Sequence, residues 1–288
     1  MASSSVASRE RSPILTRWRR AQWLPHLVLL VLLVLTFYPV ILMLLFSVKS
    51  NAQFFTQRFM LTFPLHFDNF ERAWNTDIAK YMFNSVTYVS VSVVLTLIPA
   101  GISAYAFARI NFIGKEFLFY FIIALLMIPG VLTLVPAFVL LLKLNMLSTR
   151  WAMWLPYAAG GQAFAVFVLR TFFAGLPEEL FEAARIDGAN ELRILTSIAF
   201  PLSQPIFGTL ALLQTYGIWN DLIWPMTVNV NPNLRPVMVG LLTFRGIYRT
   251  EFGPLYAGYV IASIPLILLF AFTSKLFISG LTSGAIKM

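Results

Sequence analysis

The sequence predicts an all-α polytopic membrane protein with six transmembrane helices, and two observations carry this prediction. Hydrophobic residues make up 59% of the 288 residues and charged residues only 11%, whereas a soluble domain carries about 25% charged residues. The chain also contains long uncharged runs that can each cross the ~30 Å hydrocarbon core of a bilayer. A soluble helical protein of this composition would leave too much apolar surface in water, so the bilayer is the expected solvent.

The charge balance fits the same prediction. Lys and Arg outnumber Asp and Glu by 21 to 12, which we interpret as orientation signals and attraction to anionic headgroups. Nucleic acid is not a predicted partner, because the basic residues are not interleaved with aromatic ones. The sequence has no cysteine, which excludes disulfides, thiol catalysis and cysteine metal sites. His26 and His66 lie far apart in different contexts, so no metal site is predicted.

The distribution of charged residues predicts the N-terminal tail, the first span and the first loop. Residues 1–21 are rich in Ser and then in Arg, and we expect a cytoplasmic tail. Residues 22–48 contain no Lys, Arg, Asp or Glu and would reach roughly 40 Å as a helix. The h-region of a signal peptide has only about 7–15 residues, so this run is interpreted as a retained first span. The polar residues 49–80 are expected to form an external loop.

Five further uncharged or nearly uncharged runs predict the remaining spans. Pro129-Gly130 and Pro136 interrupt the third span, so a kink or break is expected there. Pro156 should loosen the fourth. The expected spans two to six cover residues 81–108, 117–142, 151–169, 201–226 and 253–274, with a second external loop at 227–252 and a short tail at 280–288.

Six spans place both termini on the same side of the membrane. The count of Lys and Arg on the two sides gives only a weak bias. The arginines that precede the first span decide the orientation, because the first helix often dominates, and they place both termini in the cytoplasm. The polar segment 175–201 between spans four and five is then cytoplasmic as well.

This polar segment is predicted to form a helix, a sharp turn and a second helix. Pro177 and the acids after it suit a first helical turn, and Asp187-Gly188 is a helix stop. Asn190 is a plausible cap for a second helix over 191–199. Periodicity leaves two interpretations open. The segment either packs against its own spans, or presents Ala183-Ala184 as a docking element for a cytosolic partner.

The spacing of particular residues in this segment resembles a known family. Glu182-Ala183-Ala184 is followed by Gly188, nine further residues, Ile198 and then Phe200-Pro201. This pattern is similar to the signature of the permease subunits of bacterial ABC importers, departing from it only in Phe200, where Leu is usual. The resemblance implies a type I ABC importer permease fold, with residues 81–279 as the permease core and a cytoplasmic coupling helix that docks on a separate ATPase. The implied ATPase-coupling residues are Phe181, Glu182, Ala183, Ala184, Asp187 and Gly188.

Further stretches resemble the carbohydrate branch of this family, specifically the smaller partner of the maltose type. They are Asn84-Ser85, residues 104–109, Trp219-Asn220-Asp221 and residues 279–287. The resemblance implies a non-catalytic subunit of a sugar importer in the bacterial inner membrane. Its implied partners are a second permease subunit, two ABC ATPase subunits that hold the ATP and Mg, and an extracytoplasmic sugar-binding protein. No phosphate-binding G-x-x-x-x-G-K-[ST] motif occurs in the chain, so ATP hydrolysis is assigned to a partner and no cofactor to this chain.

The resemblance also implies that the C-terminal tail contacts the ATPase, with simple disorder of the tail as the alternative. The tail residues concerned are Leu281, Thr282, Ser283 and Gly284.

Polar residues within the spans are candidates for the substrate path. Asp221 is the only carboxylate in its apolar run, and an ionisable residue inside a membrane span is a functional candidate. Its distance of roughly 30 Å along the helix from Pro201 places it near the outer interface, which favours a structural or gating role. Other candidates for hydrogen bonds to a sugar, or alternatively between helices, are Asn84, Thr87, Tyr88, Gln162, Gln214, Tyr216 and Asn220.

Two alternatives remain open at this point. The first is an ABC permease of the same architecture for a polyamine or glycerol phosphate. The second is an ion-coupled carrier or an intramembrane enzyme. An enzyme should carry an H-E-x-x-H motif, paired carboxylates or a Ser/His set within its spans, and the sequence has none of these.

Overall fold

The computed structural model describes residues 23–246 and 250–285, with side chains up to residue 274. The described residues form helices joined by turns, apart from one isolated β-bridge between Arg245 and Thr250. The long helices are α2 (Trp23–Ser47), α5 (Ala79–Arg109), α6 (Lys115–Leu125), α7 (Gly130–Lys143), α8 (Trp151–Ala174), α12 (Gln204–Asn220) and α15 (Phe252–Ala285). The short ones are α3 (Asn51–Thr56), α4 (Asp68–Ala73), η1 (Trp74–Ile78), α9 (Glu178–Ile186), α10 (Glu191–Ile194), η2 (Leu195–Ala199), α11 (Phe200–Leu202), α13 (Ile223–Val228), η3 (Pro232–Leu234), α14 (Val237–Gly240) and η4 (Leu241–Phe244).

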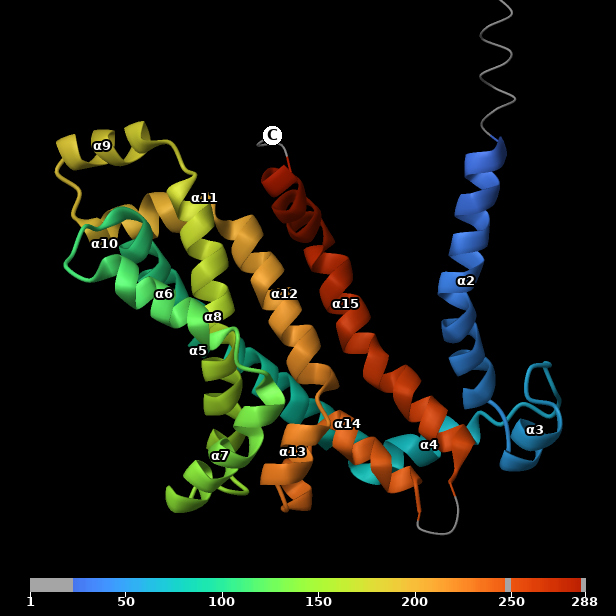
Figure 1. Cartoon of the computed structure of the whole chain (residues 1–288). Coiled ribbons are helices and arrows are strands. Elements are labelled where there is room, and N and C mark those ends of the chain that lie inside the picture. Colours follow the sequence, from blue (N-terminus) through green and yellow to red (C-terminus); the bar gives the residue numbers. More distant parts are fainter. Residues whose placement is uncertain (1–22, 247–249, 286–288) are drawn as a thin grey trace, which may run out of the picture.

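Among the described residues, four helical segments are long and apolar enough to cross a membrane, and the second of them includes a kink at Thr76 and Asp77. They are Trp23–Ser47, Asp68–Arg109, Trp151–Ala174 and Phe252–Ser274. Two bent pairs, α6 with α7 and the segment Glu191–Leu202 with α12, raise the number to as many as six. The all-helical membrane fold predicted from the sequence is therefore confirmed, and the six predicted spans are reached if each bent pair counts as one span (Figure 1).

The bends lie at prolines, though not always at the expected ones. The third span breaks between α6 and α7 with an angle of 96°, and Pro129 is the residue that precedes α7. Pro136 stays inside the continuous α7, so its predicted interruption is wrong. Helix α8 likewise continues through Pro156.

The fifth span differs from its predicted bounds at both ends. Helix α12 begins at Gln204 and not at Pro201, after a bend of 74°. Pro205 has no N–H to continue the helical hydrogen bonds across the bend. The helix ends at Asn220, before the expected Met226, because Asp221 Oδ1 accepts hydrogen bonds from the following backbone and starts α13.

One boundary agrees with the prediction and another differs. The backbone leaves the helical conformation at Thr76 and Asp77, so α4 lies within the predicted external loop 49–80 and α5 begins at Ala79, close to the predicted start at residue 81. Helix α15 continues to Ala285, so the predicted tail starting at residue 280 is largely helical. Residues 1–21 and 286–288 lie outside the described residues.

Two prolines inside continuous helices have their freed carbonyl oxygens satisfied by neighbours. Pro99 in α5 cannot donate to Leu95 O, and Gln162 Nε2 of α8 donates there at 3.0 Å. Pro156 in α8 leaves Ala152 O free in the same way, and Trp224 Nε1 donates to it at 3.0 Å. Such side chains let a proline stay within a membrane helix, because no water is present to bond the carbonyl.

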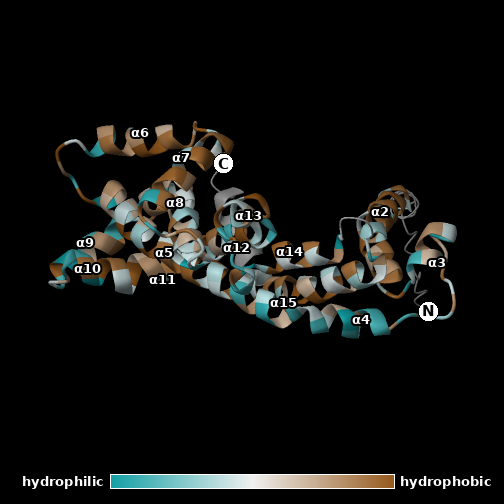
Figure 2. Ribbon diagram, turned by 90° about the horizontal axis from the view of Figure 1, so that it is seen from below, coloured by the Kyte–Doolittle hydropathy of each residue, from teal (hydrophilic) through white to brown (hydrophobic). Residues whose placement is uncertain are grey.

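The bundle is elongated, with different helices at its two ends. Helices α9 and α10 lie at one end and α2 and α3 at the other when the structure is seen from below (Figure 2). Helix α2 approaches α15 near α4 and diverges from it further along (Figure 1), and most of its side chains are exposed. The spans themselves run between two other ends, seen in Figure 1, which we name the α9 end and the α4 end after the short helices found there.

We predict that Gln162→Leu lowers the free energy of unfolding by about 1 kcal/mol, because it leaves Leu95 O without a donor. Reversible unfolding in detergent or lipid measures this change. In a Pro99→Ala background the introduced alanine supplies its own N–H, so the same substitution should cost less. An equal cost in both backgrounds would contradict the role assigned to Gln162.

Candidate functional site

The segment between α8 and α12 forms the helix, turn and helix that the sequence predicts. Helix α9 ends at Ile186, and Gly188 adopts a left-handed φ of +79° after it. Asn190 Oδ1 then accepts a hydrogen bond from Arg193 N at 2.8 Å and caps α10. The predicted helix stop and the predicted cap are thus confirmed.

One face of α9 is buried against the spans. Phe181 is fully buried and Ala184 is nearly so. The Phe181 ring lies 4.0 Å from the Arg109 guanidinium and 6.4 Å from the Tyr105 ring, both at the end of α5. The expectation that Phe181 and Ala184 offer contact surface to a partner is therefore corrected, because these two side chains anchor α9 to its own spans.

Arg109 holds the start of α9 in place. Its guanidinium donates to the carbonyl oxygens of Phe173 at 2.7 Å and Leu176 at 2.6 Å, which lie at and after the end of α8. It also forms an ion pair with Glu178 of α9. One buried cation thus joins the ends of two spans to the first turn of α9.

Tyr105 holds the second helix of the segment. Its hydroxyl donates to Glu191 Oε2 at 2.6 Å, and Arg185 Nε donates to Glu191 Oε1 at 3.2 Å. Arg185 also contacts Glu178, so α9 and α10 are joined by a charged bridge. The hydrogen bond to Glu191 raises the pKa of Arg185 above its ordinary value.

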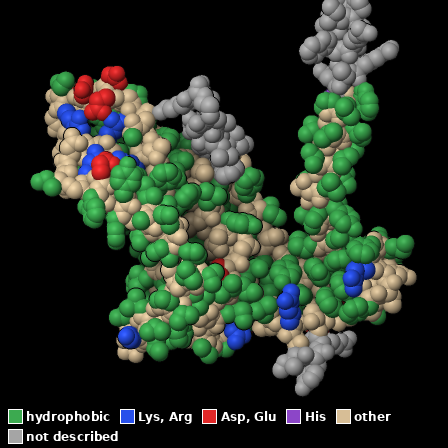
Figure 3. All heavy atoms as spheres, viewed as in Figure 1, with side chains coloured by type: hydrophobic (Ala, Val, Ile, Leu, Met, Phe, Trp, Pro, Cys, Tyr) green, Lys and Arg blue, Asp and Glu red, His purple; other side chains and the backbone are tan. Residues whose placement is uncertain are grey.

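The opposite face of α9 is open, and we call it the α9 outer face. It consists of the exposed residues Glu179, Glu182, Ala183 and Ile186, which the helical repeat places along one side. Ile186 is 86% exposed, and Leu192 beyond the turn is 67% exposed. Acidic and basic side chains gather at this end of the molecule, in contrast to the apolar middle (Figure 3). The α9 outer face combines carboxylates with bare apolar side chains, which suits a protein contact.

Sequence reasoning missed Arg109, Tyr105 and Glu191 as members of the site. The available signal was that Arg109 is the one charge at the end of an uncharged span, close in topology to the acids of the polar segment. A single arginine facing several acids does not reveal which acid it pairs with.

Two of the predicted substrate-path residues have structural partners instead. Asn84 Nδ2 donates to the carbonyl oxygens of Asn233 and Arg235, and the Tyr88 hydroxyl donates to Leu234 O at 2.7 Å. Both side chains are buried. They fasten the loop after α13 to α5, and their surroundings leave no surface for a solute.

Two further candidates lie inside the spans. Gln214 Nε2 donates to Thr96 Oγ1 at 2.5 Å and so joins α12 to α5. Asp221 Oδ2 accepts from the Tyr157 hydroxyl at 2.9 Å. Asp221 and Tyr157 also line a cavity of about 500 Å³ between α7, α8 and α13. Asp221 is thus both a helix cap and part of a cavity wall.

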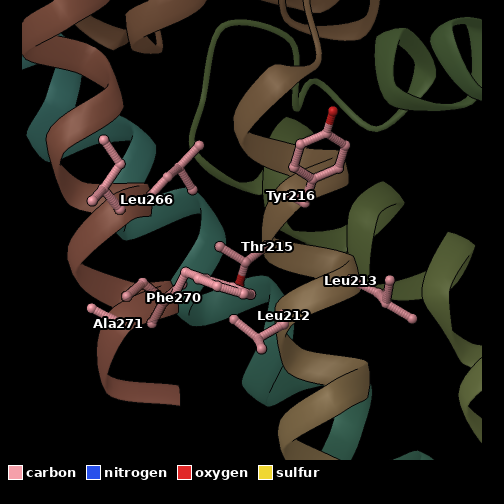
Figure 4. Close-up of a pocket in the computed structure, with 9 residues that line it drawn as sticks. Leu212, Leu213, Thr215, Tyr216, Leu266, Phe270 and Ala271 are labelled. Carbon is pink, nitrogen blue, oxygen red and sulfur yellow. The ribbon is translucent and has the colours of Figure 1, made fainter. Parts of the chain in front are cut away.

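Tyr216 and Asn220 are exposed on α12. Tyr216 borders an apolar pocket of about 540 Å³ between α12 and α15. Leu212 and Thr215 face Phe270 across this pocket, while Leu213 points away (Figure 4). Asn220 Nδ2 donates to Tyr216 O at 2.9 Å within the same helix.

The predicted tail residues continue a helix. Leu281, Thr282, Ser283 and Gly284 belong to the last part of α15, and their side chains lie outside the described set.

The substrate-path candidate Thr87 bonds within its own helix, because its hydroxyl donates to Phe83 O of α5.

Comparison with known proteins identifies the family. Residues 97–282 match the family described as "Binding-protein-dependent transport system inner membrane component". The chain is 33% identical to the arabinooligosaccharides transport system permease protein AraQ of Halalkalibacterium halodurans, over 97% of this chain and 99% of AraQ. It is also 33% identical to the probable ABC transporter permease protein YurM of Bacillus subtilis, over 87% of this chain and 83% of YurM.

Two further matches are a relative of similar sequence and a solved structure of similar fold. The trehalose/maltose transport system permease protein MalG of Thermococcus litoralis is 33% identical over 72% of this chain and 75% of MalG. A chain of a bacterial ABC transporter involved in the import of the acidic polysaccharide alginate superposes with a TM-score of 0.77. That match has 23% identity and covers 95% of this chain and all of the other. It shows that the fold is shared. The chain therefore belongs to the family of inner-membrane permease components of binding-protein-dependent ABC transporters.

Proposed function

We propose that this chain is a permease subunit of a sugar importer, forms half of its translocation pathway and docks on a separate ABC ATPase through the α9 outer face. The single observation that carries the docking proposal is the arrangement of α9. Its inner face is fixed to the spans, and its outer face leaves Glu182, Ala183 and Ile186 exposed. A helix held this way can transmit a displacement imposed by a partner to the membrane-spanning helices.

The sugar assignment rests on the relatives. AraQ is a permease of arabinooligosaccharide transport, and the Thermococcus litoralis protein is a permease of trehalose and maltose transport. The cavity beside Asp221 does not add to this argument, because most of the residues that line it are apolar and Tyr157 and Asp221 bond each other.

The expected assembly contains a second permease subunit, two ABC ATPase subunits and an extracytoplasmic sugar-binding protein, within membrane lipid. ATP and Mg bind in the ATPase subunits, and both termini of this chain lie in the cytoplasm. Closure of the ATPase pair then moves α9 and opens the spans outward, where the binding protein delivers its sugar. Asp187 and Gly188 shape the turn that positions the α9 outer face.

We predict that Gly188→Val weakens co-purification of the ATPase while the chain still inserts into the membrane. The φ of Gly188 is +79°, and no atom lies within 4 Å of the position that a Cβ atom would take. The effect therefore comes from the backbone, at about 1–2 kcal/mol. Gly188→Asn should retain binding, because Asn tolerates this conformation.

Gly114→Val is the matched control for this experiment. Gly114 has a similar φ of +81° and open space around it, but it lies in the turn before α6. It should carry a similar backbone cost and leave ATPase co-purification unchanged. Equal loss of the ATPase with both valine variants would argue against docking at α9.

The substrate class is tested by the ATPase activity of the complex reconstituted with its binding protein. We expect stimulation by at least one oligosaccharide or disaccharide. Silence with every sugar, together with a response to a polyamine or to glycerol phosphate, would overturn the sugar assignment and leave the permease assignment standing. Solute uptake without ATP would instead indicate an ion-coupled carrier.

A further inference from the structure

The anchors of α9 come from an unexpected element. In the chain, α9 and α10 lie between α8 and α12, yet Arg109, which pairs with α9, and Tyr105, which bonds Glu191 of α10, both belong to the end of α5. The Arg109 side chain is only 8% exposed, and Tyr105 is buried. An arginine fork held on three partners fixes its position more firmly than a point charge would. The segment is therefore fastened to a span that is distant in sequence.

Helices α5 and α8 are themselves joined by polar contacts along most of their length. The two residues of each contact are separated by 62 to 67 positions in the sequence. This nearly constant separation means that the two helices are parallel and keep one register. From the α4 end to the α9 end the contacts join Ser92 to Trp154 O, Thr96 to Ala158 O, Gln162 to Leu95 O, Arg170 to Phe107 O and Arg109 to Phe173 O. Hydrogen bonds in an apolar medium resist exchange with water, so this pair forms a stiff unit.

The fifth and sixth spans differ in how they join this unit. Helix α12 is tied to it by directed hydrogen bonds, because Gln214 Nε2 donates to Thr96 Oγ1 of α5 and to Tyr157 O of α8. Helix α15 packs against α12 and α2, and the apolar pocket of about 540 Å³ lies between α12 and α15. Apolar contacts beside a void adapt to movement more easily than a row of directed hydrogen bonds.

From these observations we infer that α9 moves as one rigid unit with α5 and α8, relative to α15, and that Arg109 and Tyr105 are the positioning residues that hold α9 to this unit. The inference rests on the proposed docking of an ATPase at α9 and names the spans that receive its movement. Motion of α9 would then reach the α4 end through α8, where Tyr157 contacts Asp221 and Ala152 O contacts Trp224.

The test uses pairs of spin labels, because a chain without cysteine needs no prior removal of native thiols. Leu180→Cys on α9 is paired with Val94→Cys on α5 or with Ile267→Cys on α15, and all three positions are exposed. Val94 lies about 22 Å along α5 from Arg109. We expect that adding a non-hydrolysable ATP analogue and Mg to the assembled complex leaves the 180–94 distance unchanged and shifts the 180–267 distance. A 180–94 shift as large as the 180–267 shift would overturn the inference.

A second arm needs no ATPase and examines the anchor in the isolated chain. Arg109→Met and Tyr105→Phe, alone and together, should broaden the distribution of the 180–94 distance. Arg193→Gln is the matched control, because Arg193 is an exposed arginine of the same segment whose side chain makes none of the hydrogen bonds or ion pairs found among the described residues, and the distribution should stay narrow. Unchanged distributions in all variants would overturn the positioning role.

The complex also separates positioning from docking. With Tyr105→Phe the ATPase should still co-purify and hydrolyse ATP, while sugar transported per ATP falls. If the ATPase does not co-purify with the unmodified chain, the proposed docking is contradicted. Failure of the docking proposal is therefore distinguishable from failure of the positioning role. Unchanged transport per ATP in Tyr105→Phe and Arg109→Met would contradict the inference alone.

Discussion

The buried guanidinium of Arg109 is the contact on which the arrangement of the α9 end depends. It pairs with Glu178, donates to one carbonyl oxygen at the end of α8 and to one just after it, and covers the Phe181 ring. A buried charge is costly unless it is paired and hydrogen-bonded, and here those partners belong to separate elements. The requirement to satisfy one cation therefore brings the ends of α5 and α8 and the start of α9 together.

The same rule governs the polar groups inside the spans. Prolines free carbonyl oxygens in α5 and α8, and side chains from neighbouring helices donate to two of them. Each such bond both lets the helix continue through its proline and ties that helix to its neighbour. Sequence analysis offered Asn84 and Gln214 either as sugar contacts or as bonds between helices. In the structure Asn84 bonds the loop after α13, and Gln214 joins α12 to α5.

The sequence was sufficient for features that depend on local chemistry. Uncharged length predicted the spans, Gly188 predicted the turn, and Asn190 predicted the cap. It was insufficient wherever the answer depends on which helices are neighbours. The helix breaks at Pro129 and continues through Pro136, although both residues are prolines for which the sequence predicted an interruption. Lys49, expected in a polar loop, is almost fully buried because three backbone carbonyl oxygens accept from its ammonium group. The division of Ala183 and Ala184 between an exposed and a buried face likewise required the packing of α9.

That division allows the most direct test of docking through the α9 outer face. Ala183→Cys and Ala184→Cys would each be treated with a short thiol-to-amine crosslinker in the complex with the ATPase. The two substitutions are chemically identical and adjacent, but only Ala183 is exposed. Docking of the ATPase on the α9 outer face predicts a crosslink from position 183 and little or none from position 184. Equal crosslinking from both positions, or crosslinking from position 184 alone, would contradict this docking.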